Sequence, residues 1–293
     1  MPNSRFAGLF GTLVFLMAAV ASRPVLAEPV IGLFTDFGWD DPYVAQMKGC
    51  IVTIEPRAQI LDLIHSVAPF NVTEGAYLLE QASEEFPSGT IFVAVVDPDV
   101  GGTEHDPILL ETNKGKYYIG RDNGLFTRVI DHEGFAKAWT LDKPEFYRPG
   151  ATSHTFHGRD IFGPIAAHLA SGVDPDRLGT PLKSISLLTT REASAQGGTV
   201  SAEVQHIDRF GNIILNLHED DDAASSLKEG NLVRVSVGRE SYSGPLVKTY
   251  GEVAKGRMLL LYGGSGALEI SVNQGSAAHL LKVEPGQVIY LKP

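Results

Sequence analysis

The run GTIFVAVVDPDVG, residues 89–101, decides the fold class of this chain. Its centre, residues 91–96, is apolar at every position, as is typical of a strand buried on both faces of a parallel sheet. The turn sequence Asp-Pro-Asp follows at 97–99 and ends the strand. The run therefore predicts a central strand with carboxylates at its carboxyl end.

Strand and helix patterns alternate on the amino-terminal side of this run. Apolar runs at 29–37 and 58–67 predict strands, and each is followed by a segment with apolar residues at helical spacing, 40–56 and 71–87. This β-α-β-α-β order predicts an α/β domain with a doubly wound, mostly parallel sheet and helices on both faces.

The carboxyl-terminal third has a different character. The α/β domain is expected over 28–187, where its last helix runs from about Asp160 to Ser171. A polar, glycine-rich stretch predicts a linker over 188–198. Short strands separated by turns then predict a small β-barrel or sandwich over 199–293.

Residues 1–27 predict a cleaved export signal. Arg5 precedes a short apolar run, and small residues near Ala27 suit signal peptidase. An uncleaved anchor is the alternative, although the apolar run is short for a membrane span. We therefore expect an exported protein, periplasmic or extracellular, that is not a membrane protein once the signal is removed.

Composition argues against several classes of partner. The chain has 24 Lys and Arg against 35 Asp and Glu, a formal net charge of −11 at pH 7. Such an acidic protein is unsuited to binding nucleic acid or an anionic membrane surface. The single cysteine, Cys50, excludes an intrachain disulfide.

Polar residues that follow the predicted strands are the first candidates for a functional site. Asp36 follows the first strand and Asp97 the third, and ligands of open parallel sheets bind at the carboxyl ends of the strands. His157 precedes a predicted helix, whose dipole favours the neutral imidazole. Each of these residues has a structural alternative, because Asp and His are also common beside turns and helix caps.

Cofactor motifs are absent from the sequence. There is no P-loop, no dinucleotide fingerprint, no zinc spacing and no nucleophile elbow. Asp36, Asp97, Asp99 and His157 are not spaced as a local ligand set for a metal. We therefore expect neither a metal nor a cofactor.

Six motifs in order resemble the S-adenosyl-L-methionine (SAM) hydrolase family, also called SAM hydroxide adenosyltransferases. They are LFTDFGWDDPYVAQMKG, VVDPDVG, RDNGLF, TFHGRDIFGPIAAHLASG, HIDRFGNIILNL and LEISVNQGSAA, and they span nearly all of the chain beyond residue 27. The resemblance implies an α/β domain, a C-terminal β-barrel and a homotrimer with active sites between subunits. It also implies an SN2 reaction in which water attacks C5′ of SAM and releases adenosine and L-methionine.

The resemblance also assigns roles to residues. Asp36 would hold the ribose hydroxyls, Asp208 the methionine ammonium, and Asn212 with the backbone around Asn273 and Gln274 the adenine. An Asp-Arg-His trio would place the water, and Asp97 and His157 match two of its members. Further substrate contacts are expected from the following barrel residues: Phe210, Ser265 and Glu269.

The arginine of this trio has no match. The family pattern places it a few residues after the VVDPGVG motif, where this chain has Asp99 for glycine, an apparent one-residue insertion, and His105. His105 is therefore a catalytic candidate, but imidazole cannot duplicate a permanent forked cation. The alternatives are that Arg121 or Arg159 reaches in, or that the reaction is altered.

Two other functions are compatible with these residues. An exported, non-catalytic SAM- or nucleoside-binding protein would keep the binding residues while the water site stayed idle. A SAM-dependent halogenase would need a hydroxyl donor beside the halide, but Gly158 stands where the fluorinase-like pattern carries serine.

Overall fold

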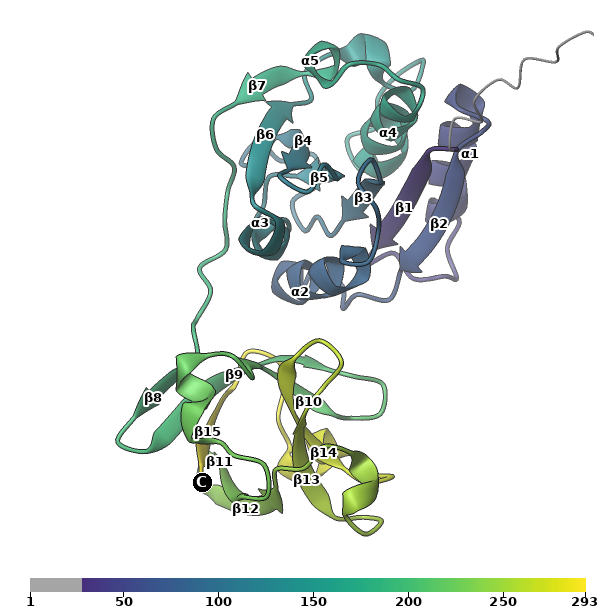
Figure 1. Ribbon diagram of the computed structural model, residues 1–293. Coiled ribbons are helices and arrows are strands. Elements are labelled where there is room, and N and C mark those ends of the chain that lie inside the picture. Colours follow the sequence, from purple (N-terminus) through teal and green to yellow (C-terminus); the bar gives the residue numbers. More distant parts are fainter. Residues whose placement is uncertain (1–27) are drawn as a thin grey trace, which may run out of the picture.

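The computed structural model describes residues 28–293, and the predicted export signal lies outside the described residues. The chain forms an α/β domain and a smaller, barrel-like β domain, joined by one extended segment (Figure 1). This architecture confirms the predicted fold class. Within residues 28–293, no helix has both the length and the apolar character needed to cross a membrane.

The α/β domain is built on a seven-stranded sheet in the order β2-β1-β3-β5-β4-β6-β7. Its first four strands in this order run parallel, and β4, β6 and β7 add an antiparallel flank. The central strand β3 is buried at all five positions, as its sequence predicts. The bounds are β1 (Val30–Thr35), β2 (Gln59–Ile64), β3 (Ile91–Val95), β4 (Pro107–Thr112), β5 (Tyr117–Arg121), β6 (Phe135–Thr140) and β7 (Thr180–Leu182).

Helices cover both faces of this sheet. One face packs Met47 of α1 and Ile165 of α4 against Val93, and the other packs Leu79 of α2 against Phe92. Successive residues of β3 therefore enter opposite cores, which is the arrangement of a doubly wound sheet. The helices are α1 (Tyr43–Ile54), α2 (Val72–Ser83), α3 (Thr127–Glu133), the 3-10 turn η1 (Pro144–Phe146), α4 (Gly163–Ala170) and α5 (Pro175–Leu178).

The helix predicted from Asp160 to Ser171 has two parts in the structure. A π-helix, η2 (Gly158–Phe162), comes first, and α4 continues from it. The Gly163 N–H bonds to the carbonyl of Gly158, five residues back. Pro164 has no N–H and so cannot donate the hydrogen bond of an α-helical turn at this position. The wide turn lies directly after His157.

The second domain is an eight-stranded antiparallel sheet that is nearly closed. Seven strands follow the order β12-β11-β15-β9-β10-β14-β13, β8 pairs with β9, and a bridge between Leu246 and Leu260 brings the two ends together. The elements are β8 (Ser194–Gln196), β9 (Thr199–Ile207), β10 (Ile213–His218), η3 (Asp222–Ser226), β11 (Leu232–Val237), β12 (Glu240–Pro245), η4 (Tyr250–Glu252), β13 (Met258–Tyr262), β14 (Ala267–Val272), α6 (Ala277–Leu281) and β15 (Val288–Lys292).

The linker segment contains a strand that the sequence does not predict. Strand β8 lies inside residues 188–198 and pairs with β9 across a turn at Gly197 and Gly198, both of which have positive φ. Helix α2 faces the barrel (Figure 1), and Glu74 at its start forms an ion pair with His206 of β9 at 3.0 Å. The two domains of one chain therefore meet along α2.

Candidate active site

Asp36 and Asp97 leave neighbouring parallel strands at the same edge of the sheet. Strands β1 and β3 pair with Thr35 opposite Val95, and the Asp36 N–H donates to the Val95 carbonyl at 3.2 Å. Asp36 follows β1 directly, and Asp97 lies two residues beyond the end of β3. The two carboxylates therefore share one rim, as the strand order predicts.

The Asp36 carboxylate is oriented by the backbone just before α2. Its Oδ2 accepts a hydrogen bond from the Phe70 N–H at 2.9 Å. Phe70 has a φ of 66°, a left-handed conformation that costs most residues about 1 kcal/mol. Phe70 is also 70% exposed. The strained turn thus presents a fixed carboxylate beside an exposed aromatic ring.

Asp97 is paired with Arg121, the last residue of β5. Arg121 Nε lies 3.5 Å from Asp97 Oδ2, and the two side chains are 3% and 5% exposed. Asp97 Oδ1 accepts from the Asp99 N–H at 3.3 Å. Burial raises the pKa of Asp97, and the Arg121 cation opposes that rise. The pair brings together residues from neighbouring strands β3 and β5.

His157 enters the same rim from the loop before η2. This π-helix lies against β3 and β5, and an added Cβ on Gly158 would lie 3.6 Å from Val95 Cγ2. Burial lowers the pKa of His157, and the nearby Arg121 cation lowers it further. Both effects disfavour the imidazolium, so the neutral ring is the form present at neutral pH.

Buried polar atoms without a hydrogen-bond partner are concentrated at this rim. Of seven such side-chain atoms in residues 28–293, four belong here: Asp97 Oδ2, Asp99 Oδ2, Arg121 Nε and His157 Nδ1. Buried polar groups are normally hydrogen-bonded, and clusters of exceptions occur at functional sites. Together the four atoms offer a donor, two carboxylate acceptors and an imidazole nitrogen to a small polar molecule.

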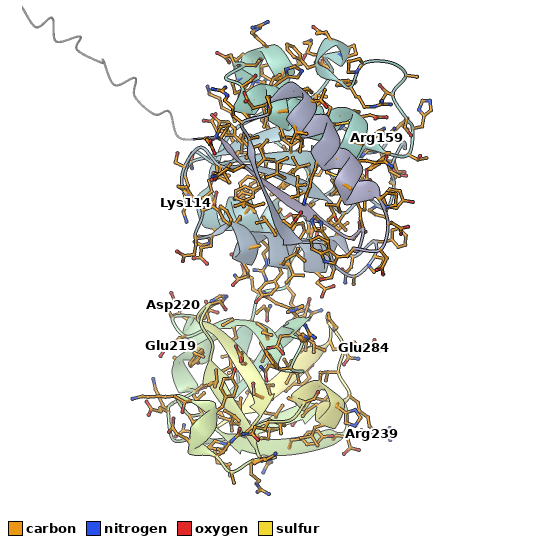
Figure 2. All side chains as sticks on the ribbon, turned by 90° about the vertical axis from the view of Figure 1, so that its right-hand side faces the viewer. Lys114, Arg159, Glu219, Asp220, Arg239 and Glu284 are labelled. Atoms are coloured by element: carbon orange, nitrogen blue, oxygen red, sulfur yellow. The ribbon has the colours of Figure 1, made fainter. Side chains whose placement is uncertain are left out.

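The other two candidates for the unmatched cation form no ion pair with Asp97. His105 is near enough for its charge to act on Asp97 but has no hydrogen bond or ion pair within the described part of the chain, so its catalytic assignment stays a prediction from sequence. Arg159, labelled in Figure 2, donates to Gln46 of α1 and pairs with Asp160 of η2 at 2.7 Å. Arg121 is the cation that the structure places beside Asp97.

A second set of predicted residues lines a cavity of about 610 Å³ in the barrel. Five of the predicted substrate contacts line it, together with four residues that sequence reasoning missed. The predicted five are Asp208, Phe210, Asn212, Asn273 and Gln274, and the others are Tyr250, Val272, Gly275 and Ser276. Val272, Gly275 and Ser276 belong to the LEISVNQGSAA motif, although no role was predicted for them. Tyr250 lies in none of the motifs, and the fold of the barrel brings it, on η4, beside the end of β14.

Asp208 organises the turn at the mouth of this cavity. Its Oδ1 accepts from the backbone N–H groups of Phe210 at 2.9 Å and Asn212 at 2.8 Å, and its Oδ2 accepts from Asn212 Nδ2 at 2.8 Å. Asn212 is 7% exposed, whereas Phe210 is 75% exposed. The carboxylate is therefore held rigidly, with its remaining lone pairs available to a cationic ligand.

Glu269 and Ser265 are placed differently from this set. Glu269 Oε2 accepts from the Tyr250 hydroxyl at 2.7 Å and so supports a cavity-lining side chain. Burial, followed by that hydrogen bond, raises the pKa of Tyr250 to about 12. Ser265 lines another hollow, together with Glu80 and His218. The structure does not bring Ser265 to the predicted site.

The described residues, 28–293, contain no group of three or more His, Cys, Asp and Glu side chains placed to hold a metal ion. The chemistry available at the rim is that of Asp97, Arg121 and His157. These groups can bind and orient a small polar molecule and can accept a proton from it.

Fold and site together define a two-domain protein with a cluster of buried polar groups at an α/β rim and a cavity in a β-barrel. Family models agree: the SAM hydroxide adenosyltransferase N-terminal domain matches residues 31–179, and the corresponding C-terminal domain matches residues 202–290. The chain belongs to the SAM hydroxide adenosyltransferase family.

Individual relatives cover nearly the whole chain. An (R)-S-adenosyl-L-methionine hydrolase from Thermus thermophilus is 36% identical, over 88% of this chain and 97% of its own length. A fluorinase from Actinoplanes sp. is 26% identical, over 91% of this chain and 98% of its own length. The solved structure of an uncharacterised conserved protein from Thermotoga maritima is 37% identical and superposes with a TM-score of 0.86, covering 90% of this chain and all of the other.

Proposed function

We propose that this protein is an enzyme that hydrolyses SAM to adenosine and L-methionine. The observation that carries the proposal is the joint match of both domains to one family, together with 36% identity to a SAM hydrolase over nearly the full length of both chains. The buried polar atoms at the rim supply the water-handling groups that hydrolysis needs.

The reaction is a displacement at C5′ of the ribose. Water oxygen forms the new bond to C5′ as the C5′–S bond breaks, and the bonding electrons leave on sulfur, which becomes the neutral thioether of methionine. The leaving group needs no proton, so the enzyme must orient a weak nucleophile in line and accept its proton. Neutral His157 and ionised Asp97 are the acceptors at this rim, and the Arg121 cation favours both of these forms.

The binding residues divide between the two domains. At the α/β rim, Asp36 holds the ribose hydroxyls through the carboxylate lone pairs that do not accept from the Phe70 N–H. At the barrel, Asp208 meets the methionine ammonium, and the cavity around Asn212 and Gln274 takes the adenine. Asp97 and His157 then act on the water between these groups.

We also propose that the active enzyme is a homotrimer with sites between subunits, exported to the periplasm or the extracellular space. Within the described residues, no hydrogen bond or ion pair joins Asp36, Asp97 or His157 to the barrel cavity. A site shared between the α/β domain of one subunit and the barrel of another would unite them. The proposal of export rests on the sequence of residues 1–27.

The structure does not favour the halogenase alternative. A Cβ on Gly158 would lie 3.1 Å from Met47 Sδ, in a fully buried contact, so the chain has no space for a hydroxyl side chain there without repacking. The curated relatives at 34–36% identity are named hydrolases, whereas the fluorinases are 26% identical. The non-catalytic binder has no comparison in its favour.

A product assay tests the proposal. Purified protein spanning residues 28–293 is incubated with SAM, and products are separated by chromatography and identified by mass. Adenosine and methionine in equal amounts are expected, without any requirement for halide. Because the relatives' names specify the (R) configuration at sulfur, both sulfonium epimers are assayed separately. Unchanged SAM with measurable binding would contradict hydrolysis and support the binder.

A further inference from the structure

Arg121 is a buried cation whose hydrogen-bonding capacity is only partly used. It is 3% exposed. Its Nη2 donates to the carbonyls of Asp99 at 3.2 Å and Gly102 at 3.0 Å, while Nε has no hydrogen-bond partner. A buried guanidinium is costly unless its donors are satisfied. The Nε faces Asp97 Oδ2 at 3.5 Å without a hydrogen bond, so both atoms remain able to bind a small polar molecule.

The loop after β3 is built around this arginine. Both carbonyls that Arg121 holds belong to the segment of residues 97–105, which lies between β3 and β4. A Cβ on Gly102 would collide with the Asp99 carboxylate, and a Cβ on Gly101 with the His154 carbonyl. Arg121, Asp99 and the two glycines are therefore packed tightly together. Through Gly101 they contact His154, in the loop that precedes His157.

The same cation acts on both neighbouring titratable groups. Burial lowers the pKa of His157, and the Arg121 cation lowers it further. From the same segment of the chain as His157, Asp160 raises this pKa and His154 lowers it. Arg121 also opposes the rise that burial causes in the pKa of Asp97. These effects agree with the ion-pair geometry between β3 and β5.

We propose that Arg121, at the end of β5, is the cation of the water site in this chain, in place of His105 of the β3–β4 loop. The inference rests on the proposed hydrolase function. Arg121 Nε donates to the oxygen of the attacking water, and Asp97 Oδ2 and His157 Nδ1 are the acceptors for its protons. The two Nη2 bonds fix the loop that carries Asp97, so Arg121 also acts as a positioning residue.

Steady-state kinetics with SAM form the first arm of the test. Arg121→Gln removes the charge, and we expect kcat to fall on the order of 10²- to 10³-fold while KM changes less than about threefold. Arg121→Lys keeps the charge but loses the fork, and should recover part of that loss. Arg128→Gln, on α3, is the matched control with unchanged kinetics. His105→Gln tests the competing cation and should lose far less than Arg121→Gln.

The titration of His157 forms the second arm and needs no substrate. The imidazole is followed by NMR in labelled protein, with His157 assigned from the His157→Gln spectrum. Wild-type protein should show a pKa below the ordinary histidine value, and Arg121→Gln should raise it, moving the acid limb of kcat/KM to higher pH. Circular dichroism of each variant verifies folding, and Arg121→Met, which also removes the charge, replaces Arg121→Gln if the latter does not fold.

The outcomes separate this inference from the proposed function. An unchanged His157 titration, or a greater kinetic loss in His105→Gln, overturns the assignment of Arg121. Wild-type protein that leaves SAM intact overturns the hydrolase, and it does so whatever the titration shows. A shifted titration together with the expected loss of kcat supports both.

Discussion

At the scale of single residues, His157 and Asp36 are expected to fail in different ways. His157→Ala removes a group that acts on water, so kcat should fall about 10²- to 10⁴-fold with little change in KM. Asp36→Ala removes a fixed ligand of the ribose, so KM should rise at least about tenfold. Steady-state assays with SAM measure both values, with His132→Ala as a control on the surface of α3. A large rise of KM in His157→Ala would contradict the division of roles.

Asp160 has a structural role at the start of η2. It is fully buried and accepts from Arg148 at 2.6 Å, from Arg159 at 2.7 Å and from the Ser153 N–H at 2.7 Å. These bonds outweigh burial and lower the pKa of Asp160 to about 2. We expect Asp160→Asn to lower the free energy of unfolding by about 2 kcal/mol at pH 7, as judged from urea denaturation.

The pH dependence of that difference has a defined sign. Because the folded pKa of Asp160 lies below the ordinary carboxyl value of 3.8, its contribution is fully present above that value. The contribution is lost as pH falls toward 2. The advantage of wild type over Asp160→Asn should therefore shrink between about pH 4 and pH 2. A constant difference over that window would show that the charge of Asp160 is not what stabilises η2.

The sequence predicted Asp97 and His157 as catalytic residues but did not distinguish among the candidates for their cation. Arg121 directly precedes the turn signal Asp-Asn-Gly, which explains this stretch of sequence without a functional role. It is also 24 positions from Asp97. Its pairing depends on β5, not β4, lying beside β3. Two apolar runs on either side of Asn113 and Gly115 predict a hairpin of β4 and β5. The sequence does not show which of these two strands pairs with the parallel sheet.

At the scale of elements, the β3–β4 loop depends on a tight approach between Asp99 and Gly102. Gly102→Ala should lower the free energy of unfolding by about 1–2 kcal/mol and reduce kcat, because the new Cβ would displace the Asp99 carboxylate. The double variant Asp99→Gly, Gly102→Ala should recover most of both losses. Urea denaturation and kinetics on the four members of this cycle measure the coupling. Additive losses would show that the two positions do not interact.

The elements that the sequence failed to predict share a physical cause. The π-helix η2 and strand β8 are both short, and their shape is set by tertiary contacts instead of by hydrophobic periodicity. The fully apolar strand β3 and the 12-residue helices α1 and α2 were predictable, because burial imposes a hydrophobic pattern on each of them.

At the scale of the whole molecule, the proposed trimer can be tested by complementation. His157→Ala inactivates the α/β half of a site, and Asp208→Asn removes the charge from the barrel half. In a trimer that contains both variants and has its sites between subunits, about one site in three combines two intact halves. Co-expression with two different tags, followed by tandem purification, should therefore yield up to about a third of wild-type kcat per site.

Each variant purified alone provides the control for that experiment, and light scattering gives the mass of the assembly. Mixed assemblies as inactive as the single variants would place both halves of the site within one chain. The change between long and short elements near residue 187 predicted two domains. The cavity in the barrel was predictable only in part, because its lining comes from the β9–β10 turn, from η4 and from the end of β14 with the turn after it, which are distant in sequence.

The ion pair between Asp97 and Arg121 spans two strands of one sheet, and this has a consequence for protein engineering. The distance between the two charges is set by the pairing of β3 with β5, in which Val93 lies opposite Ile119. Changes of length in the intervening hairpin leave that pairing in place, whereas a slip of one residue would turn Arg121 to the opposite face. A library built on this scaffold must therefore leave the inward residues of β3 and β5 unchanged, and must keep Gly115 at the hairpin tip, because its positive φ and its close approach to Ser88 leave no room for a side chain.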